Sequence, residues 1–301
     1  MRTSNPALND QIFARETPAE LRSGWASPAG PATIEQGTTR AAWAPGRVRS
    51  GPDSVSPWPP SSAPPGYESM RLGGVVSASA VLLALLLTAA YFGWQSVKIV
   101  TATNLAGEEV VVSRSIPPWL FVSVIVGLVL AIVTIFKPKL ARITAPLYAL
   151  AEGFFLGAIS HLYEVQYDGI VLQAVGLTVG VFLIMLFLYA TRIIKVTRNL
   201  MLGIVCATGA VGLVYLVSFL ARIFGADIPF IHDAGPIGIG FSLVVVVIAA
   251  LNLVLDFDFI ERGVAMHAPR HMEWYGAFGL LVTLIWLYLE LLRLLSKLRS
   301  R

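Results

Sequence analysis

Charged residues are scarce in this chain of 301 residues, at 13% of the total against roughly 25% in soluble domains. Hydrophobic residues make up 56% of it. A soluble domain of this size needs a charged surface that such a composition cannot supply, so one soluble globular domain is excluded. A chain that is disordered throughout and a collagen-like chain are excluded on the same ground.

Cysteine is nearly absent as well, since Cys206 is the only one. An intrachain disulfide and a thiolate-only metal cluster are therefore excluded. Cys206 lies in an apolar stretch, where it acts as a small hydrophobic residue. The net charge of +4 would suit nucleic acid, but basic loop residues that set membrane orientation explain it better. We expect no nucleic-acid partner.

The common enzyme signatures are missing. The sequence contains no G-x-x-x-x-G-K-[ST], H-E-x-x-H or G-x-S-x-G pattern. An intramembrane aspartyl protease needs one aspartate on each of two facing helices, whereas Asp256 and Asp258 are two residues apart on one segment. No histidine lies deep enough for an intramembrane serine protease. We expect a protein that is not an enzyme and has no cofactor and no resident metal.

Residues 1–69 differ in composition from the rest of the chain. They hold 11 of the 18 prolines and balance six arginines with six acidic residues. Because no long apolar pattern runs through them, they cannot bury enough surface to offset the loss of chain entropy. We predict a disordered, proline-rich cytoplasmic tail at 1–69, followed by a membrane domain at 70–301.

Seven apolar runs follow, each close to the roughly 20 residues that cross a bilayer. They are continuous rather than alternating, which favours helices over the strands of a barrel. The sequence therefore predicts an all-α membrane protein, a bundle of seven transmembrane helices. The predicted segments are 72–94, 117–136, 143–162, 170–191, 200–222, 236–259 and 274–296.

Basic loop residues predict the orientation, because they collect on the cytoplasmic side. Nine lie on the side of the amino terminus and three on the other, which predicts a cytoplasmic amino terminus in the cell membrane. Those nine are Arg71, Lys137, Lys139, Arg142, Arg192, Lys195, Arg198, Arg262 and Arg270. The chain nevertheless ends in Lys297, Arg299 and Arg301. Either this positive end is translocated, or the seventh segment does not cross completely.

Four acidic residues lie inside the runs: Glu152, Asp256, Asp258 and Glu290. A charge at the centre of a spanning helix costs on the order of 3 kcal/mol on insertion scales. No lysine or arginine is expected deep inside any segment. This excess of buried acid suits the handling of protons or cations, because an unpaired carboxylate in a bilayer holds a cation or takes up a proton.

Each acidic residue also has a purely structural interpretation. Asp256 and Asp258 would then be interfacial carboxylates at a helix end, and Glu290 would pair with Arg293 three residues later. Glu152 would make a structural hydrogen bond. Asn252 is expected to form a polar contact between helices.

Small residues recur at a spacing typical of helix packing, in the pairs Gly153 with Gly157 and Gly176 with Gly180. Such pairs let two helix backbones approach closely in lipid. We expect them to pack within the bundle.

Several segments together resemble the Bax inhibitor/YccA-like family, most closely a bacterial branch with a long amino-terminal extension. The sixth run ends Leu-Val-Leu-Asp256-Phe-Asp258-Phe-Ile, and the last contains Leu-Tyr-Leu-Glu290-Leu-Leu-Arg293-Leu-Leu. The third run contains Glu152-Gly-Phe-Phe-Leu-Gly157. The likeness covers about residues 70–298.

The resemblance implies a seven-helix bundle with a central last helix, and a pH-sensitive calcium leak. In the family, an aspartate in each of the last two helices shares a proton and senses pH. The first matches Asp256. The second matches Glu290 if the alignment is anchored on Leu-Tyr-Leu, and Thr283 if it is anchored on Leu-Leu-Arg. The family's basic latch falls near Lys137. Calcium would be the transported ion rather than a cofactor.

Two functions follow from these observations. The first is a cation leak in the cell membrane, gated by protonation of Asp256, Asp258, Glu290 or Glu152. The alternative is a non-conducting regulator that binds other membrane proteins, such as a membrane protease, besides the lipid bilayer. A secondary transporter is disfavoured, because no inverted repeat is evident.

Overall fold

The computed structural model describes residues 68–103, 109–115, 117–225 and 235–300. Within them, seven helices are long and apolar enough to cross a membrane. They are α3 (Leu72–Ser96), α4 (Trp119–Phe136), α5 (Ala141–Gln166), α6 (Ile170–Ala190), α7 (Arg198–Ile223), α9 (Pro236–Ala265) and α10 (Met272–Arg299). Each corresponds to one predicted segment, so the predicted seven-helix bundle is confirmed. The predicted tail lies outside the described residues, apart from its last two positions.

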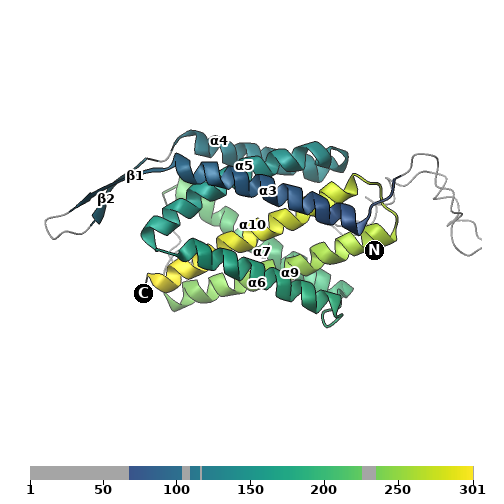
Figure 1. Cartoon of the computed structure of the whole chain (residues 1–301). Helices are drawn as coiled ribbons and strands as arrows, with labels where there is room; N and C mark the ends of the chain where they lie inside the picture. Colours follow the sequence, from purple (N-terminus) through teal and green to yellow (C-terminus); the bar gives the residue numbers. More distant parts are fainter. Residues whose placement is uncertain (1–67, 104–108, 116, 226–234, 301) are drawn as a thin grey trace, which may run out of the picture.

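Helix α10 runs through the middle of the bundle (Figure 1) and packs against α3, α5, α6 and α9. It is therefore the element that most of the others share. One hydrophobic core lies between α10, α3 and α5, and a second lies between α10, α9 and α6.

Helices α3 and α5 pack closely because α5 presents glycines to the α3 backbone. A Cβ atom added to Gly153 would lie 2.3 Å from the Leu86 carbonyl oxygen, and one added to Gly157 would lie 1.8 Å from the Ala90 carbonyl oxygen. The predicted packing of this pair is confirmed. For Gly176 and Gly180 it is wrong within the described residues, where nothing lies within 4 Å of an added Cβ.

Helix α7 is the least buried of the seven and packs mainly against α9. The Asn252 side-chain amide of α9 donates to the Thr208 hydroxyl oxygen of α7 at 2.8 Å. The predicted polar contact between helices is thus confirmed, and it joins α7 to the rest of the bundle.

A β-hairpin interrupts the series of helices between α3 and α4. Strand β1 (Lys98–Thr103) pairs antiparallel with β2 (Glu109–Ser115), with an irregularity between Val100 and Thr101. The hairpin extends away from the bundle at the end where the chain terminates (Figure 1). The sequence reading did not predict it.

The first and last described residues lie at opposite ends of the bundle (Figure 1). At one end, the Arg270 backbone N–H donates to the Glu68 carbonyl oxygen at 3.0 Å, beside the α9–α10 loop. At the other, Arg299 donates to the Asp168 carbonyl oxygen in the α5–α6 turn. Helix α10 therefore runs the whole length of the bundle, which argues against a seventh segment that crosses incompletely.

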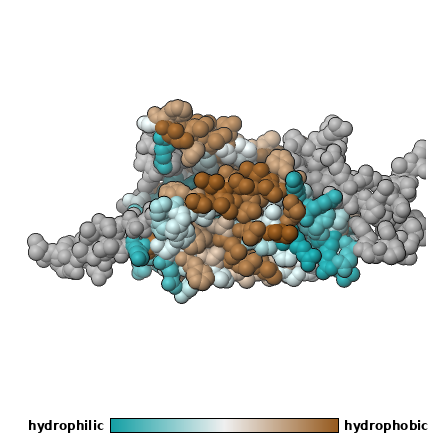
Figure 2. All heavy atoms as spheres, turned by 90° about the horizontal axis from the view of Figure 1, so that it is seen from above, coloured by the Kyte–Doolittle hydropathy of each residue, from teal (hydrophilic) through white to brown (hydrophobic). Residues whose placement is uncertain are grey.

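The surface has the zones that a bilayer requires. Figure 2 shows hydrophobic residues over the middle of one face, with hydrophilic residues gathered toward its ends. Exposed apolar side chains are numerous on α3, α4 and α6. Exposed apolar area of this extent matches hydrocarbon rather than water.

Candidate functional site

The Asp256 carboxylate lies against the central helix. Asp256 is nine residues, or about 14 Å, from the end of α9 at Ala265. Its Oδ1 atom would be 3.6 Å from a Cβ atom added to Gly279 of α10. That distance is an ordinary van der Waals contact, so the carboxylate lies directly against α10.

Thr283, one turn beyond Gly279, faces the Asp256 carboxylate from α10. The Thr283 hydroxyl donates to the Gly279 carbonyl oxygen at 3.2 Å. The second carboxylate oxygen of Asp256, Oδ2, is buried and has no hydrogen-bond partner among the described residues. A buried carboxylate oxygen without a partner is costly unless it carries a proton or meets a cation.

Of the two positions on α10, Thr283 is therefore the one that faces Asp256. Glu290 lies two turns further along α10, about 10 Å away along the axis. The arrangement agrees with the Leu-Leu-Arg anchoring of the alignment. The α9–α10 site then holds one carboxylate and one hydroxyl instead of two carboxylates.

Asp258 has a separate, local partner. It forms an ion pair with Arg262 one turn later on α9. Nearby, Glu261 accepts hydrogen bonds from the Tyr189 hydroxyl and from Arg192, both at the end of α6. These contacts fasten α9 to α6 at the end of the bundle where the described chain begins, and they match the interfacial interpretation of Asp258.

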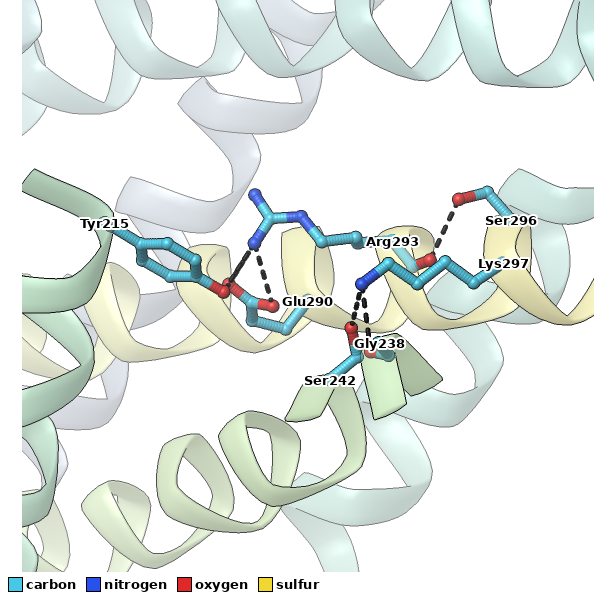
Figure 3. Close-up of polar contacts among 7 residues, drawn as sticks. All are labelled: Tyr215, Gly238, Ser242, Glu290, Arg293, Ser296 and Lys297. Atoms are coloured by element: carbon cyan, nitrogen blue, oxygen red, sulfur yellow. Dashed lines mark hydrogen bonds and ion pairs between the residues drawn. The ribbon is translucent and has the colours of Figure 1, made fainter. Parts of the chain in front are cut away.

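Glu290 belongs to a second polar cluster, in the other half of the bundle (Figure 3). Its side chain is 2% exposed. The Tyr215 hydroxyl of α7 donates to Glu290 Oε1 at 2.8 Å, and Arg293 Nη1 lies 3.1 Å from the same oxygen. The Arg293 guanidinium also stacks 4.9 Å from the Tyr215 ring centroid. The structural interpretation, in which Glu290 pairs with Arg293, thus describes the geometry, with Tyr215 as an added partner.

Lys297 lies on the outer side of this cluster and is also buried. Its ammonium donates to the Gly238 carbonyl oxygen at 3.0 Å and to the Ser242 hydroxyl oxygen at 2.9 Å, both in the first turns of α9 (Figure 3). Lys297 follows the predicted seventh segment and lies in the last turn of α10, so the expectation that no basic residue lies deep inside a segment is not contradicted by it. Its aliphatic stem crosses apolar surface while its ammonium reaches polar atoms, and no periodicity in the sequence signals that.

Glu152 lies apart from the other acidic residues and faces α4. Its Oε2 atom would be 2.8 Å from a Cβ atom added to Gly127. Lys137, the latch candidate, is exposed at the end of α4. Within residues 68–300, as far as they are described, no ion pair joins Lys137 to Asp256.

The structure thus disperses the predicted site residues instead of gathering them. In the described part of the chain, histidine, cysteine, aspartate and glutamate side chains nowhere form a group of three that could hold a metal ion. The predicted residues lie in three separate places: Asp256 lies beside Thr283, Glu290 lies in its own polar cluster, and Glu152 faces α4. Among these predicted site residues, as far as the structure describes them, Asp256 is the one whose carboxylate has a buried oxygen without a hydrogen-bond partner.

A protein-family comparison matches nearly the whole chain. The model of the family described as Bax inhibitor 1 like covers residues 5–300, which extends well before the first membrane helix. No curated protein matches the chain. With its seven membrane-length helices and this match, the chain is a multi-pass membrane protein that belongs to the Bax inhibitor 1-like family.

Proposed function

We propose that this protein is a cation leak in the cell membrane, with calcium as the transported ion and its amino terminus in the cytoplasm. Protonation of Asp256 gates the leak. The observation that carries the proposal is the buried Oδ2 atom of Asp256, which has no hydrogen-bond partner among the described residues. The family and the seven helices support a membrane role but leave the transported ion open.

Protons and cations compete for the Asp256 carboxylate. When the carboxylate is ionised, its free oxygen attracts a cation, because an unpaired charge in a low-dielectric interior is costly. When it is protonated, the neutral acid is tolerated between α9 and α10 without a cation. Thr283 and Gly279 of α10 face the carboxylate in this arrangement.

The half of the bundle where α10 ends contains a further barrier to cations, in addition to Asp256. A cation that enters from the end where α10 terminates meets Arg293 and Lys297 before it reaches Asp256. Glu290 neutralises Arg293, so the cluster keeps the net positive charge of Lys297, and a positive charge slows the passage of cations, which suits a leak of low conductance. We therefore assign Glu290 to the closed structure of this half rather than to proton sensing.

Calcium flux into proteoliposomes tests the proposal. Purified protein is reconstituted into vesicles loaded with a calcium indicator, and flux is compared with protein-free vesicles over a pH series. We expect flux that depends on the presence of the protein and on pH. No flux at any pH would contradict the leak and favour the alternative, a non-conducting regulator of other membrane proteins.

A further inference from the structure

A cavity of about 800 Å³ opens at the end of the bundle where the described chain begins. It lies between the first turns of α3, α5 and α10 and the α9–α10 loop. Its charged lining residues are Glu68, Arg71, Arg142, Arg270 and Glu273. None of these takes part in the proposed leak. Three arginines against two glutamates leave the cavity with a net positive charge.

Both glutamates already have partners within the cavity wall. Glu68 forms an ion pair with Arg270, and Glu273 lies 3.9 Å from the same guanidinium. Glu273 also accepts a hydrogen bond from the Arg71 backbone N–H at 3.0 Å. Arg270 is therefore neutralised, and the acidic side chains are held in place.

The guanidinium groups of Arg71 and Arg142 remain for a ligand. Both residues are exposed, and neither has an ion pair with another described residue. The pKa of Glu68 is lowered mainly by its hydrogen bond to Arg270, and both arginines add to that lowering. The positive charges of both arginines therefore reach Glu68 in the cavity wall, one from the start of α3 and one from the start of α5.

Val81 of α3 lines the cavity and is 46% exposed, and further exposed apolar side chains belong to the first turns of α3 and α5. Leu72 is 60% exposed, Val76 63% and Ile143 64%. Trp274, at the start of α10, lines the cavity. Tryptophan at this depth is typical of the membrane interface, where headgroups meet acyl chains. A ligand with a phosphate group and hydrocarbon chains fits this arrangement. A free phosphate ion would contact the arginines but not the apolar side chains.

We propose that the cavity binds the headgroup of an anionic phospholipid, with Arg71 and Arg142 at its phosphate and its acyl chains leaving past Val81 and Trp274, which line the cavity. Basic pockets between membrane helices are suited to such headgroups. Because α10 begins in the wall of the cavity, the bound lipid would fasten the start of the central helix to α3 and α5.

Lipid binding to the full-length protein tests the proposal. Native mass spectrometry measures retained phosphatidylglycerol for the unmodified protein and for Arg71→Gln/Arg142→Gln. Each basic residue near a membrane surface contributes enough that losing both should weaken binding by on the order of 30-fold. The charge-preserving pair Arg71→Lys/Arg142→Lys should retain most of the binding.

The matched control is Lys195→Gln/Arg198→Gln, which removes the same charge from the α6–α7 loop and the first residue of α7, at the same end of the bundle. It should bind phosphatidylglycerol like the unmodified protein. An equal loss in the control would overturn the site and leave only general attraction to the surface. Unchanged binding in Arg71→Gln/Arg142→Gln would overturn it as well.

Melting temperature provides a second measurement in phosphatidylcholine vesicles. Added phosphatidylglycerol should raise it for the unmodified protein and not for Arg71→Gln/Arg142→Gln. Inorganic phosphate at equal ionic strength should have no such effect. Equal stabilisation by inorganic phosphate would contradict the lipid assignment.

Discussion

At the residue scale, each buried polar group has a different set of neighbours, and these neighbours decide what it can do. Glu290 and Asp256 look equivalent in the sequence, since both are acidic and both lie in apolar runs. Glu290 has Tyr215 and Arg293 as partners, whereas Asp256 has Thr283 and one free oxygen. The first arrangement stabilises the bundle, and the second leaves a group free to bind a proton or a cation.

Removing the charge of Glu290 should destabilise the bundle. In Glu290→Gln, Arg293 loses its buried partner, and we expect a loss of about 2 kcal/mol in unfolding free energy. Tyr215→Phe keeps the ring beneath Arg293 and removes only the hydroxyl, so it should cost about 1 kcal/mol. Thermal unfolding in detergent measures both. Unchanged stability in Glu290→Gln would contradict the cluster in Figure 3.

The pair between Glu68 and Arg270 makes a small, pH-dependent contribution to stability. The hydrogen bond from Arg270 lowers the pKa of Glu68 below its ordinary value of 4.5. Because the folded-state pKa is the lower one, the stabilisation is present above that ordinary value and is lost as the pH falls through the folded-state pKa.

Melting temperatures of the unmodified protein and of Glu68→Gln over a pH series measure this effect. The unmodified protein should melt slightly higher at neutral pH, and the difference should vanish in acid. A difference that grew as the pH fell would contradict the pair.

The residue scale also shows what the sequence could reveal of the site. Asp256 was found because an acidic residue in an apolar run is rare, and that signal is local. Thr283 and Tyr215 were not selected as partners on such grounds, because hydroxyl groups are common in membrane helices. The hydrogen bonds from Lys297 to two oxygen atoms of α9 depend on how α9 and α10 cross. No local sequence pattern predicts that crossing.

At the element scale, helix packing depends on which face of a helix its glycines occupy. Gly153 and Gly157 face α3, while the equally spaced Gly176 and Gly180 face outward from α6. The spacing alone predicted contact for both pairs. It could not tell them apart, because the neighbour of a helix face is set by the whole bundle.

Matched alanine variants test this difference. In Gly157→Ala, the new methyl group would meet the Ala90 carbonyl oxygen, so α3 and α5 must separate, at a cost of about 2 kcal/mol or more. In Gly176→Ala, the methyl group meets open space, and the better helix propensity of alanine should leave stability equal or higher by up to about 1 kcal/mol. Thermal unfolding compares the two, and equal losses would contradict the packing.

Helix boundaries were predictable where hydrophobicity ends and less so where helices continue into charged turns. Helix α9 continues to Ala265 and α10 to Arg299, past the predicted ends at 259 and 296. The ion pair of Asp258 with Arg262 satisfies charges inside α9. The hairpin of β1 and β2 went unpredicted because its two short strands pair only with each other, between two much stronger apolar signals.

At the scale of the whole molecule, seven crossings place the two described ends on opposite sides. We predict that the amino-terminal side is cytoplasmic, from the distribution of lysine and arginine. The end of α10 and the turn at Asp168 then share the outer side, since Arg299 donates to the Asp168 carbonyl oxygen.

Cysteine labelling in intact cells measures this orientation. Cys206 is replaced first, because it is exposed. A new cysteine near Asp168 should react with an impermeant thiol reagent without lysis, and one near Lys195 should react only after lysis. The reverse pattern would show that the orientation is inverted.

The central claim is that one carboxylate, Asp256, links pH to cation passage. Calcium flux over a pH series in proteoliposomes, with Asp256→Asn compared with Asp258→Asn, tests it most directly. The two variants remove the same charge from the same helix, two residues apart. We predict that flux through Asp256→Asn no longer depends on pH, while Asp258→Asn and Glu290→Gln keep the pH response of the unmodified protein. A full pH response in Asp256→Asn would contradict the account.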